Sequence, residues 1–208
     1  MPRIVKKANE RKKEIITAAR ELFREKGQEN VTMQELMDKL KIAKGTIYHH
    51  FSSKEDLLEA IVEDLVDEEL QKKKKLLKSS HCRDLSALGK LRVLVTQDTM
   101  AEDNEAILEA LHHHENAAMH AKQLGKYLIE LAPVFASVIA EGHEEGVFRT
   151  DYPLECAEFM LAGVQFLTDL GFYPWDEAQL HRRMKAFPFL IESLLNAPEG
   201  SFAFLNEK

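Results

Sequence analysis

The sequence predicts an all-α protein with a small N-terminal domain of three helices and a larger helical C-terminal domain. Apolar residues recur at helical spacing along most of the chain, and the alternation typical of strands is nearly absent. The length of 208 residues exceeds that of a typical single domain, roughly 100 to 150 residues. Charge also divides the chain: residues 1–54 hold 13 Lys and Arg against 7 Asp and Glu, and the remainder holds 15 against 28. We therefore predict domains over 1–53 and 54–208.

The N-terminal domain is predicted helix by helix. The first helix covers 9–26, where the apolar residues share one face and Gly27 follows in a position that favours a left-handed cap. The second covers 33–40, and Thr32 with Glu35 has the spacing of a capping box. A short turn leads into a third helix, about 43–51. The second and third helices are expected to form a helix-turn-helix.

The C-terminal domain is predicted to begin with a long connecting helix. This helix covers 54–77, and Ser52 with Glu55 offers a second capping box at its start. Five more helices are expected over about 84–100, 102–114, 116–144, 154–171 and 175–196, where glycines and prolines separate the later ones. Pro133 lies inside the third of these and should bend it.

The segment around the third helix has side chains suited to nucleic acid. Gly45 lacks a Cβ and so permits close approach to a duplex. Thr46 offers a hydroxyl and a methyl group, for a phosphate oxygen or the thymine methyl. Tyr48 carries a hydroxyl on a rigid ring that suits phosphate, although packing within the domain is the alternative for Tyr48 and for His50.

Charged and polar neighbours extend this candidate surface. Lys44 and Lys54 supply positive charge, and His49 can donate to a phosphate or to a base edge. Thr32 lies at a helix N-terminus, where the helix dipole favours an anion. Residues 1–8 form a basic arm, for which a solvated tail is the alternative. The positive N-terminal part, in an otherwise acidic chain, is the part that a polyanion would attract.

At these residues the chain resembles the tetracycline-repressor-like (TetR) family of bacterial transcription regulators. The resemblance is carried by Ala18-Ala19-x-x-Leu22-Phe23-x-x-x-Gly27, by Val31-Thr32-Met33-x-x-Leu36, and by Lys44-Gly45-Thr46-Ile47-Tyr48-His49-His50-Phe51-x-x-Lys54-x-x-Leu57. It implies an all-helical homodimer that binds double-stranded DNA at a palindromic operator, with a C-terminal domain for dimerisation and effector binding. Ala43 departs from the family, whose members often carry Ser or Thr there.

The last two predicted helices, over 154–171 and 175–196, are the candidates for dimerisation. They are apolar on more than one side, which requires two packing partners. Candidate dimerisation residues are Phe159, Leu167, Met184, Phe187, Leu190 and Leu194. An intramolecular core of a monomer is the alternative.

A small-molecule effector would need an apolar cavity with a few polar groups. Candidate lining residues are Leu111, His114, Met119, His120, Tyr127, Phe135, Phe159 and Phe166. The simpler interpretation is that the apolar members form core. The effector, if present, is expected to release the protein from DNA.

The histidines of the chain suggest two alternative functions. One is a metal-responsive regulator, and the other is a small helical metal-binding protein or enzyme without DNA function. His113, His120 and His143 are weak metal candidates, because imidazole binds Zn²⁺ and Ni²⁺ but no compact metal motif is present. His113 and His120 would share a face only if one helix continued between them. No enzyme signature is found, so neither a catalytic residue nor a cofactor is expected. A nonspecific nucleoid protein is excluded because the chain is acidic.

Location is predicted from apolar runs and cysteines. No apolar run approaches the roughly 20 residues that cross a bilayer, and no signal region follows the basic start, so a cytoplasmic protein without membrane contact is expected. Cys82 and Cys156 lie far apart in the sequence and are expected to be reduced thiols.

Overall fold

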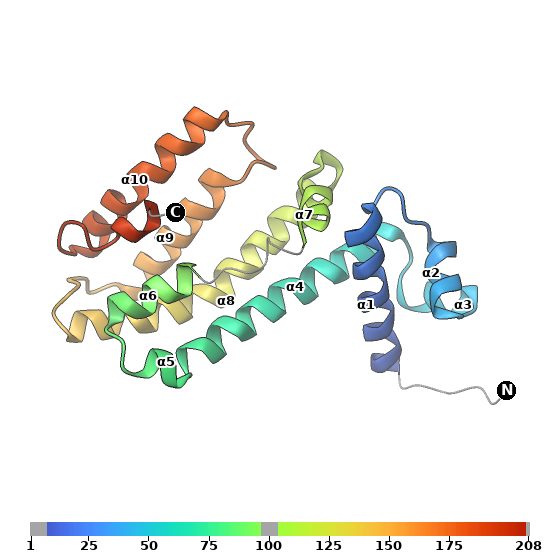
Figure 1. The fold of residues 1–208 in the computed structure, drawn as a ribbon, viewed down its shortest axis with the longest axis horizontal. Coiled ribbons are helices and arrows are strands. Elements are labelled where there is room, and N and C mark those ends of the chain that lie inside the picture. The colour runs from blue at the N-terminus through green and yellow to red at the C-terminus, as the bar shows by residue number, and fades with distance from the viewer. Residues whose placement is uncertain (1–7, 97–103, 207–208) are drawn as a thin grey trace. The chain divides into compact units, whose positions relative to one another are not determined.

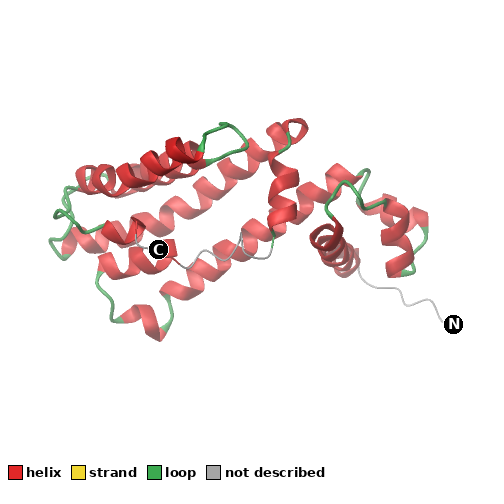
Figure 2. Ribbon diagram, turned by 45° about the horizontal axis from the view of Figure 1, so that its top comes forward, coloured by secondary structure: helices red, strands yellow, loops and turns green. Residues whose placement is uncertain are grey.

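The computed structural model describes residues 8–96 and 104–206. Every regular element in these ranges is helical, and Figure 2 shows no strand there, which confirms the all-α prediction. The α-helices labelled in Figure 1 are α1 Ala8–Lys26, α2 Met33–Leu40, α3 Lys44–His50, α4 Lys54–Leu77, α5 Ser80–Arg83, α6 Ala87–Thr96, α7 Glu105–His112, α8 Ala117–Glu144, α9 Pro153–Thr168 and α10 Glu177–Leu195. Short 3-10 helices cover η1 His114–Asn116 and η2 Ala203–Asn206. The predicted basic arm lies outside the described residues, apart from its last residue.

The described residues form two compact units. The first comprises 8–67 and 104–119, and the second comprises 68–96 and 120–206. Helix α4 contributes to both. The division at residue 53 therefore remains a prediction about function, since by packing the first unit also holds the start of α4 and the whole of α7.

The core of the first unit brings α1 to α4 together with α7. Ile15, Phe23, Ile47 and Leu58 are fully buried, and Ile107 of α7 belongs to the same cluster. Outside the core, Arg20 of α1 donates a hydrogen bond to the Asn104 side chain, at 3.3 Å, just before α7 begins. Helix α7 is therefore part of the body that carries the helix-turn-helix.

The caps confirm some sequence predictions and correct others. Gly27 adopts φ +77° after α1, as expected. The Thr32 hydroxyl accepts a hydrogen bond from the Glu35 amide at 3.1 Å, whereas the Glu35 carboxylate forms an ion pair with Lys26 instead of closing the box. At the start of α4 the cap lies one residue later than predicted: the Ser53 hydroxyl accepts from the Asp56 amide at 3.1 Å.

Polar contacts join the helices of the second unit. Lys74 of α4 forms an ion pair with Glu130 of α8 at 3.3 Å. At the other end of α8, the Glu145 carboxylate accepts from the Ala87 amide at the start of α6. Gly142 of α8 lies so close to the Phe148 ring that a Cβ there would stand 2.2 Å from a ring carbon.

Two helices of the structure begin or end at other residues than the sequence predicted. The helix expected over 84–100 begins at Ala87, because Ser79 caps the separate short helix α5 through a hydrogen bond from the Cys82 amide. The helix expected over 102–114 ends at His112, and His113 is extended with ψ 138°. Both predicted helices reach into 97–103, which lies outside the described residues.

Helix α8 is long and apolar enough, by length and composition alone, to cross a membrane. This differs from the expectation that no segment qualifies. However, α8 carries the buried His120 and Gln123 and an ion pair through Glu130, and such groups are costly in lipid. These features are those of a core helix, and Pro133 lies within it as predicted.

Candidate nucleic-acid interface and ligand site

Helix α3 packs one face into the first unit and exposes the other. Ile47 is fully buried and Phe51, which caps the helix, is 2% exposed, so these two hold α3 against the core. Lys44, Gly45 and His49 are exposed, and so is Tyr48 at 43%. A large ring that stays accessible on a short helix is available to a partner, which argues against the alternative that Tyr48 only packs.

The turn before α3 fixes its orientation. Lys41 adopts the left-handed conformation with φ 53° and its amide donates to the Asp38 carbonyl, which ends α2. The Ile42 amide then donates to the Met37 carbonyl at 3.1 Å. An ion pair between Lys39 and Glu21 at 2.9 Å further ties α2 to α1. The helix-turn-helix is thereby held as one rigid piece.

The residues predicted to contact DNA differ in how exposed they are and in what holds them in place. The Lys44 ammonium stands 5.5 Å from the centre of the Tyr48 ring, so charge and hydroxyl occupy the same patch. A Cβ added at Gly45 would meet nothing within 4 Å, which leaves this point of the helix open to a partner. Thr46 and Thr32 remain accessible. Lys54 is half-buried and donates to the Glu29 carbonyl at 3.1 Å, so it is anchored to the preceding loop.

Positive charge gathers beside α3. Burial lowers the pKa of His50 below its usual value, and the charges of His49, Lys12 and Arg11 lower it further. Since only cations lower the pKa of an imidazole through charge, the local potential at His50 is positive. The Lys12 ammonium also lies 5.8 Å from the centre of the Phe51 ring. Lys12 and Arg11 therefore place positive charge beside α3, in a chain of net charge −7.

The structure divides the predicted ligand residues between the two units. Leu111 and Met119 pack with the core of the first unit. His114 is exposed. Phe159 is 72% exposed. These residues were selected for apolar or polar character, but their neighbours are set by the break between α7 and α8 and by the outward face of α9.

The remaining predicted ligand residues belong to the second unit. His120 is 3% exposed and its Nε2 lies 2.9 Å from Asp169 Oδ2. Phe135 is buried and Tyr127 is half-buried. Phe166 is 44% exposed and contacts Phe172 with ring centres 5.2 Å apart. His120 and Phe166 therefore both reach the aromatic segment that follows α9.

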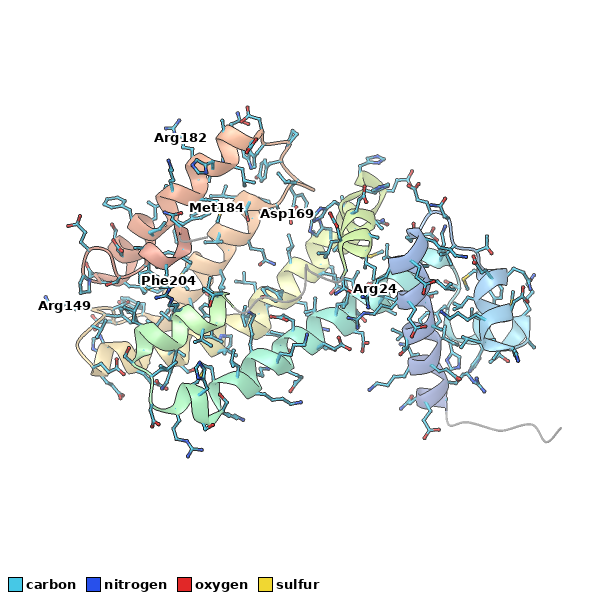
Figure 3. All side chains as sticks on the ribbon, viewed as in Figure 1. Arg24, Arg149, Asp169, Arg182, Met184 and Phe204 are labelled. Atoms are coloured by element: carbon cyan, nitrogen blue, oxygen red, sulfur yellow. The ribbon has the colours of Figure 1, made fainter. Side chains whose placement is uncertain are left out.

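Helices α9 and α10, with Leu170 just after α9, expose a large apolar surface, which we call the α9–α10 face. Its members are Phe159, Phe166, Leu167, Leu170, Met184, Phe189 and Leu190, all at least 37% exposed. Figure 3 labels Met184 on α10. Phe187, a predicted dimerisation residue, is 6% exposed, whereas Phe189, which the prediction did not include, is 68% exposed. Two residues turn a helix by about 200°, so Phe189 points outward because Phe187 points inward. Leu194 is half-buried.

Each candidate metal-binding histidine has a different partner in its own unit. His113 Nδ1 lies 3.4 Å from Glu29 Oε1, and His120 contacts Asp169. His143 Nδ1 accepts from the Thr150 amide at 3.4 Å. Helix α7 ends before His113, so the single continuous helix that would place His113 and His120 on one face is not formed.

Sequence reasoning missed a group of buried polar side chains in the second unit. Gln123 of α8 is 3% exposed, and Glu69 and Lys73 of α4 are 2% and 3% exposed. The available signal was the helical spacing of His120 and Gln123 on the stripe that continues through Leu131 and Phe135. A polar residue on such a stripe is an informative exception to the apolar pattern.

Comparisons with known proteins support this geometry. Residues 15–61 match the family model of bacterial regulatory proteins of the tetR family, and residues 99–189 match that of the tetracyclin repressor-like C-terminal domain. The HTH-type transcriptional repressor KstR2 of Rhodococcus jostii (strain RHA1) is 30% identical over 194 residues, covering 91% of this chain and 93% of that protein.

Solved structures share the fold. A transcriptional regulator from Cytophaga hutchinsonii ATCC 33406 superposes with a TM-score of 0.65 at 21% identity, covering 88% of this chain and 96% of the other. A TetR/AcrR-family regulator from Thermobifida fusca YX-ER1 gives a TM-score of 0.62 at 24% identity, covering 96% and 98% of the two chains. At such identities the likeness shows the fold alone.

Proposed function

Because the chain belongs to the TetR family of bacterial regulatory proteins, whose members bind DNA, we propose that it is a homodimeric repressor of transcription released from its operator by a small molecule. The observation that carries this proposal is α3, which is fixed by Ile47 and Phe51 and exposes Lys44, Gly45 and Tyr48. The relative named KstR2 is called a repressor, which favours repression over activation. Such a regulator acts in the cytoplasm and needs no enzymatic activity.

In this proposal α3 enters the major groove. Tyr48, Lys44 and Thr32 contact phosphates and set the position of the helix, whereas Thr46 and His49 face base edges. Gly45 allows the helix to lie close to the duplex, since nothing in the protein fills the space beside it. Lys54 adds positive charge at the start of α4, from a position fixed by its hydrogen bond to the Glu29 carbonyl.

Dimerisation in this proposal uses the α9–α10 face. An exposed apolar surface of this extent on a protein destined for water marks a protein contact. A Cβ added at Gly163 of α9 would meet nothing within 4 Å, so a partner helix can approach α9 closely there. Two copies of α3 related by a two-fold axis then read half-sites about one turn, ~34 Å, apart, which requires a palindromic operator.

Release by an effector follows from linkage. A ligand shifts the dimer away from its DNA-bound shape only if it binds the other shape more tightly. Helix α4 contributes side chains to both compact units, with Leu58 in the core of the first and Glu69 buried in the second. It is therefore the element through which a change in the second unit would reach the helix-turn-helix.

The test begins with selection of bound fragments from random double-stranded DNA. We expect a palindrome, bound by a dimer, with affinity that falls steeply as salt rises. Tyr48→Phe should weaken binding to the selected palindrome and to random DNA by a similar factor, because a phosphate contact carries no sequence information. Tyr152→Phe, which removes another exposed hydroxyl, is the matched control and should bind as the unmodified protein does.

Two outcomes would contradict parts of the proposal. Selection of no palindrome would remove the operator mechanism. A change of preferred sequence in Tyr48→Phe, rather than a uniform loss, would assign Tyr48 to base reading.

A further inference from the structure

Gln123 is a buried amide without a partner. Its side chain is 3% exposed on α8, and neither Oε1 nor Nε2 has a hydrogen-bond partner among the described residues. Burial of a carboxamide without hydrogen bonds costs folding free energy, and native proteins hold few such groups. A group kept under these conditions is available to a molecule that enters the interior of the second unit.

The neighbourhood of Gln123 is aromatic. His120 lies three residues earlier on the same face of α8 and stacks on Phe172, with ring centres 4.7 Å apart. The Asp169 carboxylate holds His120 from the end of α9, where Figure 3 labels it. Flat rings of this kind favour a flat ligand, by stacking or edge contact.

The aromatic contacts continue from Phe172 to the only tryptophan of the chain. Phe166 contacts both Phe172 and Tyr173, and Tyr173 stacks on Trp175 with ring centres 5.0 Å apart. Trp175 Nε1 is a second buried donor for which the described residues offer no partner. A natural fluorescent reporter therefore belongs to the same group of side chains.

Three buried ionisable side chains of this unit, Glu69, Lys73 and His120, have partners of opposite charge. Lys73 Nζ lies 3.1 Å from Glu69 Oε1 and donates to the Leu94 carbonyl at 2.7 Å. His120 likewise has the Asp169 carboxylate beside it. The Arg183 guanidinium is engaged as well: it stacks 3.4 Å from the centre of the Trp175 ring and donates to the Gln179 carbonyl. A charged ligand group beside Lys73, Glu69 or His120 would have no free countercharge there, which is unfavourable in a dry interior. An uncharged polar group avoids this cost.

We propose that Gln123 anchors the effector, and that the effector is an uncharged, flat molecule carrying a hydrogen-bond donor next to an acceptor, as in a carboxamide, lactam or urea. The inference rests on the proposed function. Such a group pairs with Gln123 through two hydrogen bonds: its N–H donates to Oε1 and its carbonyl accepts from Nε2. The aromatic side chains from His120 to Trp175 contact the flat body of the ligand.

The test uses benzamide, benzoate and toluene as matched probes, with Trp175 fluorescence as the readout on the full-length protein. Benzamide should bind saturably, on the order of millimolar for so small a molecule. Benzoate, which differs by its charge, should bind at least about tenfold more weakly. Equal or tighter binding of benzoate, or no saturable binding of benzamide, would overturn the proposal.

Gln123→Met separates the contribution of the amide from that of the aromatic side chains. Methionine keeps the length of the side chain but removes both hydrogen-bonding atoms, so benzamide should weaken about tenfold while toluene binds at least as well as before. Gln71→Met makes the same change at an exposed position of α4 and should leave all three probes unaffected. Benzamide binding that survives Gln123→Met would overturn the assignment of the anchor.

Stability provides an independent readout. Without any probe, Gln123→Met should raise the melting temperature, because it removes a buried amide that has no partner. A lower melting temperature would mean that the amide has a structural role, for instance through a fixed water, and would overturn the proposal. Selection of a palindrome by the unmodified protein is measured separately: if it succeeds while benzamide fails, only this inference is lost, and if it fails, the proposed function is lost.

Discussion

Helix α3 lacks a side-chain cap at its N-terminus, and this permits a quantitative test of its local stability. Ala43 has the extended backbone of an N-cap residue, φ −73° and ψ 152°, but it has no side chain that can accept a hydrogen bond. Neighbouring helices show what is absent, since Thr32 and Ser53 each accept from an amide three residues on at 3.1 Å. Ala43→Ser should therefore supply about 1 kcal/mol to α3. That free energy corresponds to roughly a fivefold change in the equilibrium between closed and open helix.

Hydrogen exchange of the α3 amides measures this equilibrium. In Ala43→Ser the amides from Ile47 to Phe51 should exchange about fivefold more slowly if α3 opens locally. Ser53→Ala makes the reverse change at α4 and should accelerate exchange in the first turn of that helix by a similar factor. If Ser53→Ala acts as expected while Ala43→Ser leaves α3 unchanged, the reasoning that α3 lacks a cap is refuted.

Three further predictions concern packing, pH and a buried ion pair. Gly142→Ala should lower the free energy of unfolding by about 1 to 3 kcal/mol in urea titrations, because its Cβ would overlap an aromatic ring, whereas Gly125→Ala, which meets nothing within 4 Å, should not. The pKa of His50 is lowered by burial, so the unfolded chain takes up the proton first and stability should fall as pH drops below 6.5; His50→Gln should flatten this fall in thermal melts at stepped pH. Lys73→Met should cost about 3 to 5 kcal/mol, since it leaves the Glu69 carboxylate buried and unpaired, and replacing both residues with apolar ones should recover most of the loss in the same titrations.

Local signals explain why the helix-turn-helix was predictable. The cap at Thr32 and the left-handed Gly27 depend on residues a few positions apart, and both are found where the pattern placed them. The buried face of α3 is likewise set by the spacing of Ile47 and Phe51. Errors of one residue arise where two candidates compete, as when Ser53 rather than Ser52 caps α4.

Long-range contacts explain what was not predictable. Periodicity identifies an apolar helix face but not the partner that covers it, so Leu111 was assigned to a ligand cavity although α7 packs into the first unit. The same limit applies to Phe187 and Phe189, which are equally apolar and point to opposite sides of α10. Only the angle at which α10 meets α9 decides which ring is covered.

The buried amide of Gln123 can be interpreted only when its place in the sequence pattern is combined with its surroundings in the structure. On the stripe of α8 that holds Leu131 and Phe135, an apolar residue at position 123 would have been the more stabilising choice, and the sequence has Gln123 instead. The structure shows that no neighbour among the described residues satisfies this amide. Its two polar atoms gain no hydrogen bond from the described residues, so the cost of burying them is recoverable when a ligand supplies the hydrogen bonds. In the proposed function such a ligand would stabilise whichever shape of the proposed dimer leaves Gln123 accessible, and that preference would be the differential affinity that release from DNA requires.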